Sequence, residues 1–262
     1  MTTVRFGLIP RGAEGDARER ELVAALSETL SCNVELHRAA DYRVALAGLE
    51  QGLVDVAWLP PLVGARAIRS GCADPLAVVV RYGDISYVTT LVTRPESPVR
   101  ALEDLRGLRV AWVDRESASG YAVLRAALAR AGVRLTEAFS EEIFVRSHAN
   151  VARAVLDGVV DVGATCAHAE DDGMRIARSP FAGDAGLPGT ELRVVFEAGP
   201  IPSDLFAVHR ALSPRLRALL QRALLQRIPE RAHAAACALC HADAFAPPTA
   251  EHRRMLDALL YT

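Results

Sequence analysis

The strongest constraint on the fold is the regular alternation of strand-like and helix-like stretches. Short apolar runs, which are typical of buried strands, alternate with longer stretches in which apolar residues recur at helical spacing. In the first part of the chain the predicted strands are residues 4–9, 33–37 and 54–59, and the predicted helices are residues 17–30 and 42–49. Strands that alternate with helices in this way indicate a mainly parallel α/β sheet.

A short pattern occurs twice and predicts two similar lobes. The letters VALA, a glycine and VDV occur within residues 44–56, and the letters VARA, a glycine and VDV within residues 151–162. Two extended stretches, near residues 84–93 and 198–208, can carry the chain out of one lobe and back. The resulting domain prediction is lobe 1, residues 1–88 and 204–262, and lobe 2, residues 89–203.

The rest of the chain adds strands and a helical tail. Further strands are predicted at residues 76–81, 87–93, 192–198 and 205–209, and a helix-like segment at residues 101–105. The stretch Gly199-Pro200-Ile201-Pro202 is expected to break the strand before it, because proline lacks an amide donor. Past Ser213 the pattern is mainly helical, with a break at residues 245–248. We expect this tail to pack on the first lobe.

Charge and composition exclude several classes of function. All 30 basic residues are arginine, so Schiff-base chemistry on lysine and a P-loop lysine are excluded. The formal net charge of −2 gives no electrostatic footprint for nucleic acid or for an anionic membrane. No apolar run approaches the roughly 20 residues that a membrane-spanning helix needs. We therefore expect neither a nucleic-acid partner nor membrane insertion.

Cysteine content and the N-terminus bear on the cellular compartment. The five cysteines, an odd number, are more typical of reduced thiols than of a disulfide framework. The chain starts with a predicted strand, without a basic start or a long apolar stretch. As written, it is therefore expected to be cytoplasmic. If a leader has been removed, the expected location is periplasmic or extracellular.

A cluster of small residues marks the first candidate site. Ser117, Ala118, Ser119 and Gly120 follow a predicted strand at residues 109–113 and precede a helical pattern. The first turn of a helix has free amides and a partial positive charge, so this turn is a candidate anion site. The serine hydroxyls add donors, and the glycine allows a ligand to approach closely. Alternatively, a serine here simply caps the helix.

Four ordered blocks resemble a known protein family. They are DYRVALAGLEQGLVDVAWLPPL, SYVTTLVTRPESPVRALEDLRGLRVAWVDRESASGYAVLRAALARAG, SHANVARAVLDGVVDVGAT and GPIPSDLFAVHRALSPRLRALL. In order and spacing they resemble the phosphonate-, phosphite- and phosphate-binding proteins of ABC importers, the PhnD-type family, over most of residues 41–220. The resemblance implies a type II periplasmic-binding-protein fold. In that fold two α/β lobes, joined by two crossing strands, close by a hinge on an oxyanion bound in the cleft between them.

The resemblance also implies roles for individual residues. In that family a Ser-Thr-Ser turn at a helix N-terminus binds the tetrahedral group, and Ser117, Ala118 and Ser119 stand at its positions. Ala118 lacks the middle hydroxyl, which is expected to weaken the anion contact by about 1 kcal/mol. The other ligand-binding positions are Tyr42, Trp58, Tyr87, Gly120, Tyr121, His148, His168 and Asp204.

Two of these positions concern the organic part of the ligand. The family's aminoalkylphosphonate binders hold the ligand's amine with carboxylates, and Asp204 matches one of them. The other, a glutamate, is replaced by His168, which removes a partner for an ammonium. Glu170, Asp171 and Asp172 lie close by in the sequence and can substitute for it.

Other interpretations of the same residues stay open. Without the resemblance, Tyr42 and Tyr87 are interpreted as packing residues, Trp58 equally as a core residue, and His148 as a cap or surface residue. Cys237-Ala238-Leu239-Cys240-His241 fits the C-x-x-C-H pattern of covalent haem, and with His233 it can indicate a metal. Two cysteines and a histidine on a helix are alternatively buried small residues and a surface imidazole.

The expected function is ligand binding without a chemical step. No nucleophile elbow, zinc-protease motif or dinucleotide fingerprint is recognised, and no cofactor or metal is predicted. We expect a binding protein for a small oxyanion, either with an ABC transporter permease as partner or as a stand-alone relative. The alternative is a cytoplasmic sensor, or a biosynthetic enzyme recruited from the binding-protein fold.

Overall fold

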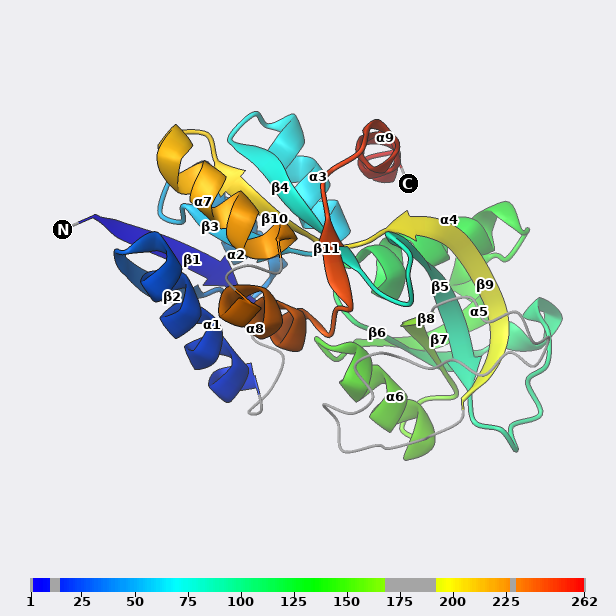
Figure 1. Cartoon of the computed structure of the whole chain (residues 1–262). Coiled ribbons are helices and arrows are strands. Elements are labelled where there is room, and N and C mark those ends of the chain that lie inside the picture. Colours follow the sequence, from blue (N-terminus) through cyan, green and yellow to red (C-terminus); the bar gives the residue numbers. More distant parts are fainter. Residues whose placement is uncertain (1, 10–14, 168–191, 227–229, 262) are drawn as a thin grey trace. The chain divides into compact units, whose positions relative to one another are not determined.

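The chain divides into two compact α/β units, each with its own sheet (Figure 1). Unit 1 comprises residues 1–85 and 202–261, and unit 2 comprises residues 86–201. The structure is a computed structural model that describes residues 2–9, 15–167, 192–226 and 230–261.

Unit 1 contains a six-stranded sheet in the order β11-β4-β10-β3-β1-β2. Its strands are β1 (Thr3–Leu8), β2 (Asn33–Arg38), β3 (Val56–Leu59), β4 (Ala73–Val80), β10 (Leu205–His209) and β11 (Ala244–Ala246). β1 pairs in parallel with β2 and β3, whereas β10 runs antiparallel to both β3 and β4. The carboxyl ends of β1 to β4 therefore lie at one edge of the sheet.

The helices of unit 1 pack on this sheet in two groups. They are α1 (Gly15–Leu30), α2 (Tyr42–Glu50), α3 (Pro61–Arg69), α7 (Pro214–Leu225), α8 (Glu230–Cys240) and α9 (Ala250–Leu259). α1, α7 and α8 contact one another, and α3 contacts α2 and α9 (Figure 1). Under α1 and α7, the rings of Phe6 and Phe206 stack with 5.9 Å between their centroids. The C-terminal tail therefore belongs to the first unit, as expected.

Unit 2 contains a five-stranded sheet in the order β7-β6-β8-β5-β9. Its strands are β5 (Ser86–Thr93), β6 (Leu108–Trp112), β7 (Phe139–Phe144), β8 (Val162–Ala167) and β9 (Arg193–Pro202). β6 is parallel to β7 and β8, and β5 is antiparallel to β8. Its helical elements are η1 (Leu102–Leu105), η2 (Ala118–Ala122), α4 (Val123–Arg130), α5 (Leu135–Ala138) and α6 (His148–Leu156).

The sequence VDV, which occurs once in each unit, marks a structural motif that the two units share. In unit 1 the amide and guanidinium of Arg5 donate to the Asp55 carboxylate over 2.7–2.9 Å, and the Asp55 amide donates to the Arg5 carbonyl oxygen. In unit 2 Arg109 and Asp161 form the same hydrogen bonds, over 2.9–3.1 Å at the carboxylate. Each aspartate thereby fixes two neighbouring parallel strands against each other.

Several predicted elements differ from the structure. The expected break at residues 199–202 is wrong, because β9 continues through both prolines. β9 is an edge strand of its sheet, where a missing amide donor is tolerated. The strand predicted at residues 54–59 begins only at Val56, and the helix-like segment at residues 101–105 is the short 3-10 turn η1. β11 and α3 were not predicted.

Candidate functional site

The turn at residues 117–120 follows β6 and leads into η2. It lies where the parallel strands of the unit 2 sheet have their carboxyl ends, which is called the carboxyl edge below. Ser117 caps this turn, because its Oγ accepts a hydrogen bond from the Gly120 amide over 3.0 Å. Ser117 and Ser119 are both buried. The cap interpretation is therefore correct for Ser117. It is compatible with anion binding, because the same geometry orients the amides that follow the cap.

The amides of this turn are arranged by π-helical hydrogen bonding. The Ala122 amide donates to the Ser117 carbonyl oxygen over 2.9 Å, and the Val123 amide donates to that of Ala118. First-turn amides have no acceptor inside their own helix, so Ala118 and Ser119 supply two donors at this edge. Within the described part of the chain the Ser119 hydroxyl has no hydrogen-bond partner. Single π turns of this kind are frequent at functional sites.

Gly120 is required for packing against the end of the preceding strand. A Cβ atom at this position would lie 2.4 Å from Cβ and Cγ2 of Val113 and 2.9 Å from Oγ of Ser117. The Gly120 carbonyl oxygen also accepts a hydrogen bond from the Val113 amide. The close contact with the end of the preceding strand therefore gives one reason for a glycine here, and the close approach of a ligand to Gly120 stays a prediction.

A chain of hydrogen bonds connects this turn to His148. The Thr89 hydroxyl of β5 contacts the Ser119 carbonyl oxygen at 2.6 Å and the Thr165 carbonyl oxygen at 3.4 Å. The Thr165 hydroxyl of β8 lies 3.1 Å from Nδ1 of His148, at the start of α6. Ser147 caps α6 by accepting from the Asn150 amide. Two helix N-termini and a histidine are thus joined through the sheet of one unit.

The tyrosines predicted for the site have different surroundings. The ring of Tyr121 packs against Trp112 and Phe144, and its hydroxyl accepts a hydrogen bond from Arg115 over 3.3 Å. These contacts give Tyr121 a packing role. Tyr87 is half-buried on β5, and Tyr42 is half-buried at the start of α2. The ligand contacts of all three tyrosines stay predictions.

Unit 1 brings Trp58 and Asp204 together at the carboxyl edge of its sheet. Asp204 directly precedes β10, whose first residue pairs with Leu59 at the end of β3. Nε1 of Trp58 donates to Oδ2 of Asp204 over 2.5 Å. Tyr42 follows β2 at the same edge, next to Asp41, which caps α2 by accepting from the Val44 amide over 2.8 Å.

Asp204 also forms a buried ion pair that the sequence did not predict. Arg81 directly follows β4, and its Nη1 and Nη2 donate to Oδ1 and Oδ2 of Asp204 over 2.6 and 3.0 Å. The side chains are 4% and 7% exposed, respectively. Nη2 of Arg81 also donates to the Cys240 carbonyl oxygen over 2.6 Å. The carboxylate expected to face a ligand amine is thus bound by a guanidinium of its own unit.

The remaining predicted residues are His168 and the candidate metal or haem ligands near the C-terminus. His168 lies outside the described residues. Cys240 is buried, and His233 lies 3.6 Å from Sγ of Cys237 while its other ring nitrogen contacts a backbone carbonyl oxygen. Across the described residues no group of three His, Cys, Asp or Glu side chains could hold a metal ion. Among the same residues, no helix combines the length and the apolar character that crossing a membrane requires.

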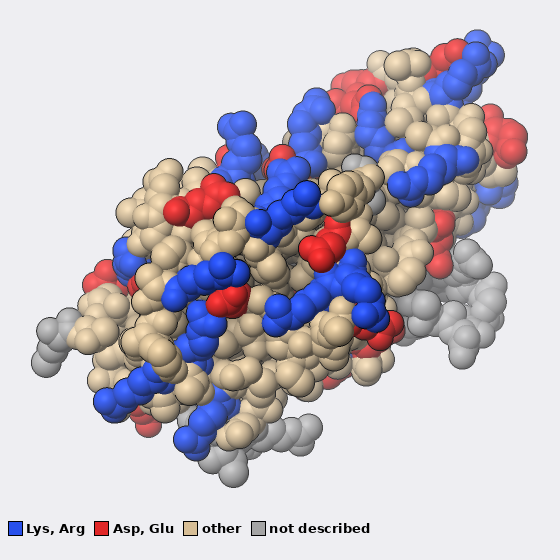
Figure 2. All heavy atoms as spheres, turned by 90° about the horizontal axis from the view of Figure 1, so that it is seen from above, with Lys and Arg blue, Asp and Glu red and all other residues tan. Residues whose placement is uncertain are grey.

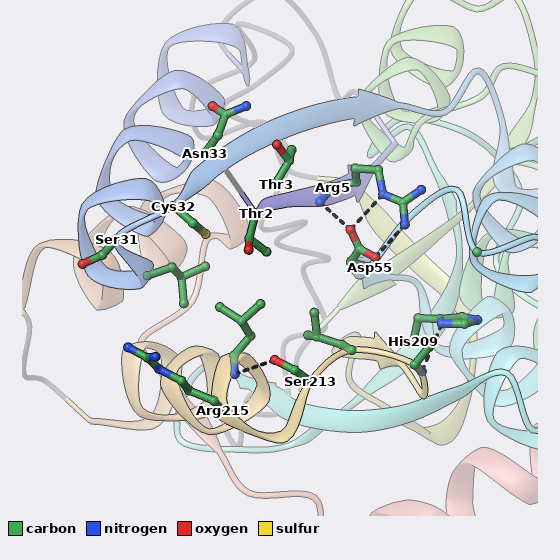
Figure 3. Close-up of a pocket in the computed structure, with 15 residues that line it drawn as sticks. Thr2, Thr3, Arg5, Ser31, Cys32, Asn33, Asp55, His209, Ser213 and Arg215 are labelled. Atoms are coloured by element: carbon green, nitrogen blue, oxygen red, sulfur yellow. Dashed lines mark hydrogen bonds and ion pairs between the residues drawn. The ribbon is translucent and has the colours of Figure 1, made fainter.

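A pocket of about 1000 Å³ in unit 1 lies at the opposite edge of the sheet (Figure 3). Its walls include Thr3 and Asn33, which begin β1 and β2, and His209, which ends β10. Arg5 and Asp55 also line it, and their charges compensate each other. The residues described as lining it include none of those predicted to bind the ligand.

Arginine and carboxylate side chains are intermixed on the face shown in Figure 2. In unit 1, Asp74 accepts hydrogen bonds from Arg210 over 3.2 Å and from Arg217 over 2.7 Å. Burial acts to raise the pKa of Asp74, but the hydrogen bonds from the two guanidinium groups outweigh it and lower the pKa. Arginine pairing with neighbouring carboxylates is thus a recurrent feature of this chain.

Sequence analysis did not identify three residues that form hydrogen bonds at the carboxyl edges of the two sheets. Thr89 and Thr165 connect the turn to His148, and Arg81 binds Asp204. The threonine-rich stretch at residues 89–93 was a signal for a β-strand only. Each of these contacts joins residues far apart in the chain, so no local pattern could reveal it.

Comparison with protein families gives a match over nearly the whole chain. The family described as "ABC transporter, phosphonate, periplasmic substrate-binding protein" matches residues 6–252. The phosphate-import protein PhnD of Mycolicibacterium smegmatis is 27% identical over 226 residues, which is 82% of this chain and 68% of that protein.

Solved structures share the fold. A binding protein component of an ABC phosphonate transporter from Pseudomonas aeruginosa has a TM-score of 0.81 at 20% identity, covering 98% of this chain and 85% of that one. PhnD1 from Prochlorococcus marinus, in complex with methylphosphonate, has a TM-score of 0.78 at 18% identity, covering 98% and 96%. The predicted type II periplasmic-binding-protein fold is therefore confirmed.

Proposed function

Since this chain belongs to the family of periplasmic phosphonate substrate-binding proteins of ABC transporters, we propose that it binds a small phosphonate, phosphite or phosphate-like oxyanion through the turn at residues 117–120. The observation that carries the proposal is the set of donors at the carboxyl edge of unit 2. The amides of Ala118 and Ser119 and the Ser119 hydroxyl are available there, and ligands of open α/β sheets bind at this edge. An oxyanion accepts such hydrogen bonds without any chemical step.

His148 is the second group of the proposed site in unit 2. Its Nδ1 lies 3.1 Å from the Thr165 hydroxyl, which fixes the orientation of the ring. A histidine held in this way can donate to an oxyanion from its other nitrogen. In unit 1 we assign ligand contacts to Tyr42, which follows β2 at the carboxyl edge, and in unit 2 to Tyr87 of β5.

Membership of the family supports a role for this chain in transport. The M. smegmatis relative is a phosphate-import protein, and the P. marinus relative was solved with methylphosphonate. By analogy with them, the proposed partner of this chain is an ABC transporter permease that receives the ligand.

Isothermal titration calorimetry with phosphate, phosphite and methylphosphonate tests the proposal. At least one of these anions should bind, and a ligand of the folded state should also raise the melting temperature. Ser119→Ala with His148→Ala should weaken binding by roughly a hundredfold, because two hydrogen bonds to a charged group are lost. Ser140→Ala is the control, because its hydroxyl bonds to Gly107 and Leu108 at the amino end of β6. Affinity retained in the double variant would place the site elsewhere.

A further inference from the structure

The two C-terminal cysteines lie on α8, which packs against α1 and α7 in unit 1 (Figure 1). Cys240 is fully buried in the core of the unit, whereas Cys237 is partly exposed. The C-x-x-C-H pattern, which fits a haem or metal site, therefore contains one thiol that is closed off from solvent and one that solvent reaches.

Cys237 is paired with a histidine on the same helix. His233 lies one helical turn before it, with 3.6 Å between Nε2 of His233 and Sγ of Cys237. The other ring nitrogen, Nδ1, lies 2.7 Å from the carbonyl oxygen of Leu224 in α7. A carbonyl oxygen can only accept a hydrogen bond, so Nδ1 carries the ring proton, and Nε2 of the neutral imidazole is the acceptor. The thiol of Cys237 is therefore the donor to His233.

The surroundings of His233 suit it to take up the thiol proton. Its side chain is 9% exposed, and its ring meets the ring of Phe245 edge on, with 5.8 Å between the centroids. Once Nε2 is protonated, both ring nitrogens are donors, Nδ1 to the Leu224 carbonyl oxygen and Nε2 to the thiolate. Because the thiolate is the reactive form of cysteine, a neighbouring base that accepts the proton makes the sulfur more nucleophilic.

We propose that Cys237 is a thiol-modification site, at which a small disulfide compound reacts to form a mixed disulfide with the protein. His233 takes the proton from Sγ, and the thiolate attacks one sulfur of the compound. The new bond from Sγ forms as the sulfur–sulfur bond of the compound breaks, and the leaving thiolate takes the proton from His233. Sγ is oxidised and the leaving sulfur is reduced, so no further oxidant is needed.

Two other cysteines of the same unit provide internal controls. Cys32 and Cys72 are partly exposed, as Cys237 is. Burial raises the pKa of the Cys32 thiol, and the Cys72 thiol donates to the carbonyl oxygen of Ala67 over 3.3 Å. Among the described residues, neither of these two thiols forms a hydrogen bond with a histidine. The three cysteines therefore differ in whether a base contacts the sulfur.

Reaction of the full-length protein with 2-hydroxyethyl disulfide at pH 7 tests the proposal, with peptide mass mapping to follow each cysteine over time. An ordinary thiol is only a few per cent thiolate at this pH, so we expect Cys237 to react at least about tenfold faster than Cys32 and Cys72. In urea, where the pairing is lost, the three rates should converge. A folded protein in which Cys237 reacts no faster than the other two overturns the proposal. The reaction needs no oxyanion, so its outcome is independent of the proposed ligand binding.

A variant of the histidine tests the role of the base. His233→Gln retains a side-chain donor but has no basic nitrogen, and it should slow the reaction of Cys237 by about tenfold or more. The rates of Cys32 and Cys72 should stay the same, and the exposed control His37→Gln should leave all three unchanged. A folded His233→Gln variant with the wild-type rate at Cys237 contradicts the role of His233. If His233→Gln does not fold, the comparison of the three thiols in the wild type decides alone.

Discussion

The Thr89 hydroxyl donates to the Ser119 carbonyl oxygen over 2.6 Å, and both residues are buried. This bond ties β5 to the turn whose amides form the proposed anion site. The next residue, Thr90, is equally buried, but its hydroxyl has no hydrogen-bond partner within the described chain. Two adjacent buried threonines of one strand thus differ in whether their hydroxyl forms a hydrogen bond.

Replacing each of these threonines by valine should have different effects on the free energy of unfolding. Thr89→Val leaves the Ser119 carbonyl oxygen without its donor and should lower the free energy of unfolding by about 1–2 kcal/mol. Thr90→Val removes a buried hydroxyl that forms no bond and should leave that free energy unchanged or higher. Urea denaturation of the two variants and the wild type measures both values. Equal destabilisation by the two substitutions would contradict the hydrogen-bond assignment.

Ala118→Ser should strengthen oxyanion binding. It supplies the hydroxyl that the resembled family has in the middle of its Ser-Thr-Ser turn, and one additional hydrogen bond is worth about 1 kcal/mol, or roughly fivefold in affinity. Calorimetric titration with methylphosphonate measures the change. Ala122→Ser, at the end of the same π turn, is the control and should have no effect on affinity. An unchanged affinity in Ala118→Ser would show that this position does not face the ligand.

The Arg109–Asp161 pair should contribute to the acid sensitivity of unit 2. Hydrogen bonding from Arg109 lowers the pKa of Asp161, so the folded state releases the Asp161 proton more readily than the unfolded state does. This stabilisation is complete above the unfolded pKa of about 4 and is lost as the pH falls through the folded pKa. The free energy of unfolding, measured by denaturant titration between pH 6 and 3, should therefore fall less steeply in Asp161→Asn. Glu103→Gln, an exposed control, should follow the wild type.

His252 should make unit 1 sensitive to pH in a higher range. Burial lowers the pKa of His252, whose Nε2 lies 3.2 Å from the Ser203 carbonyl oxygen. The folded state therefore favours neutral imidazole, and the unfolded state takes up the proton first. The resulting stability is present above the unfolded pKa of about 6.5 and is lost as the pH falls through the folded pKa. Melting temperatures measured from pH 7.5 to 5 should fall less steeply in His252→Gln than in the exposed control His37→Gln.

Local patterns in the sequence were sufficient for much of the fold. Apolar periodicity located β1, β2, α2 and β10, and the serines before a helical pattern predicted a cap at residue 117 or 119, because these features depend on residues close together in the chain. The course of β9 through Pro200 was not predictable, since it depends on the position of the strand at the sheet edge. The repeated VDV letters were recognisable, but the arginine partner of each aspartate was not.

The parts of the candidate site that could not be predicted from the sequence depend on contacts between residues far apart in the chain. Asp204 was predicted as a ligand residue, but its partner Arg81 is 123 residues away in the chain and follows a different strand, β4. Similarly, Thr89 is 30 residues from Ser119. Whether a carboxylate is available to a ligand depends on such pairing, and pairing is determined by the sheet order rather than by the neighbouring sequence.

The Arg5–Asp55 and Arg109–Asp161 pairs belong to the part of each unit that holds the sheet together, and they lie away from the segments proposed to bind the ligand. Both pairs fasten parallel strands near their amino ends, whereas the segments that follow the strands differ: a serine-rich turn after β6 and a Pro-Pro step after β3. We therefore expect an exchange of either segment to leave the two arginine–aspartate pairs in place. Grafting a relative's turn in place of residues 114–119, with Gly120 retained, is therefore a practical route to new anion selectivity on an unchanged frame.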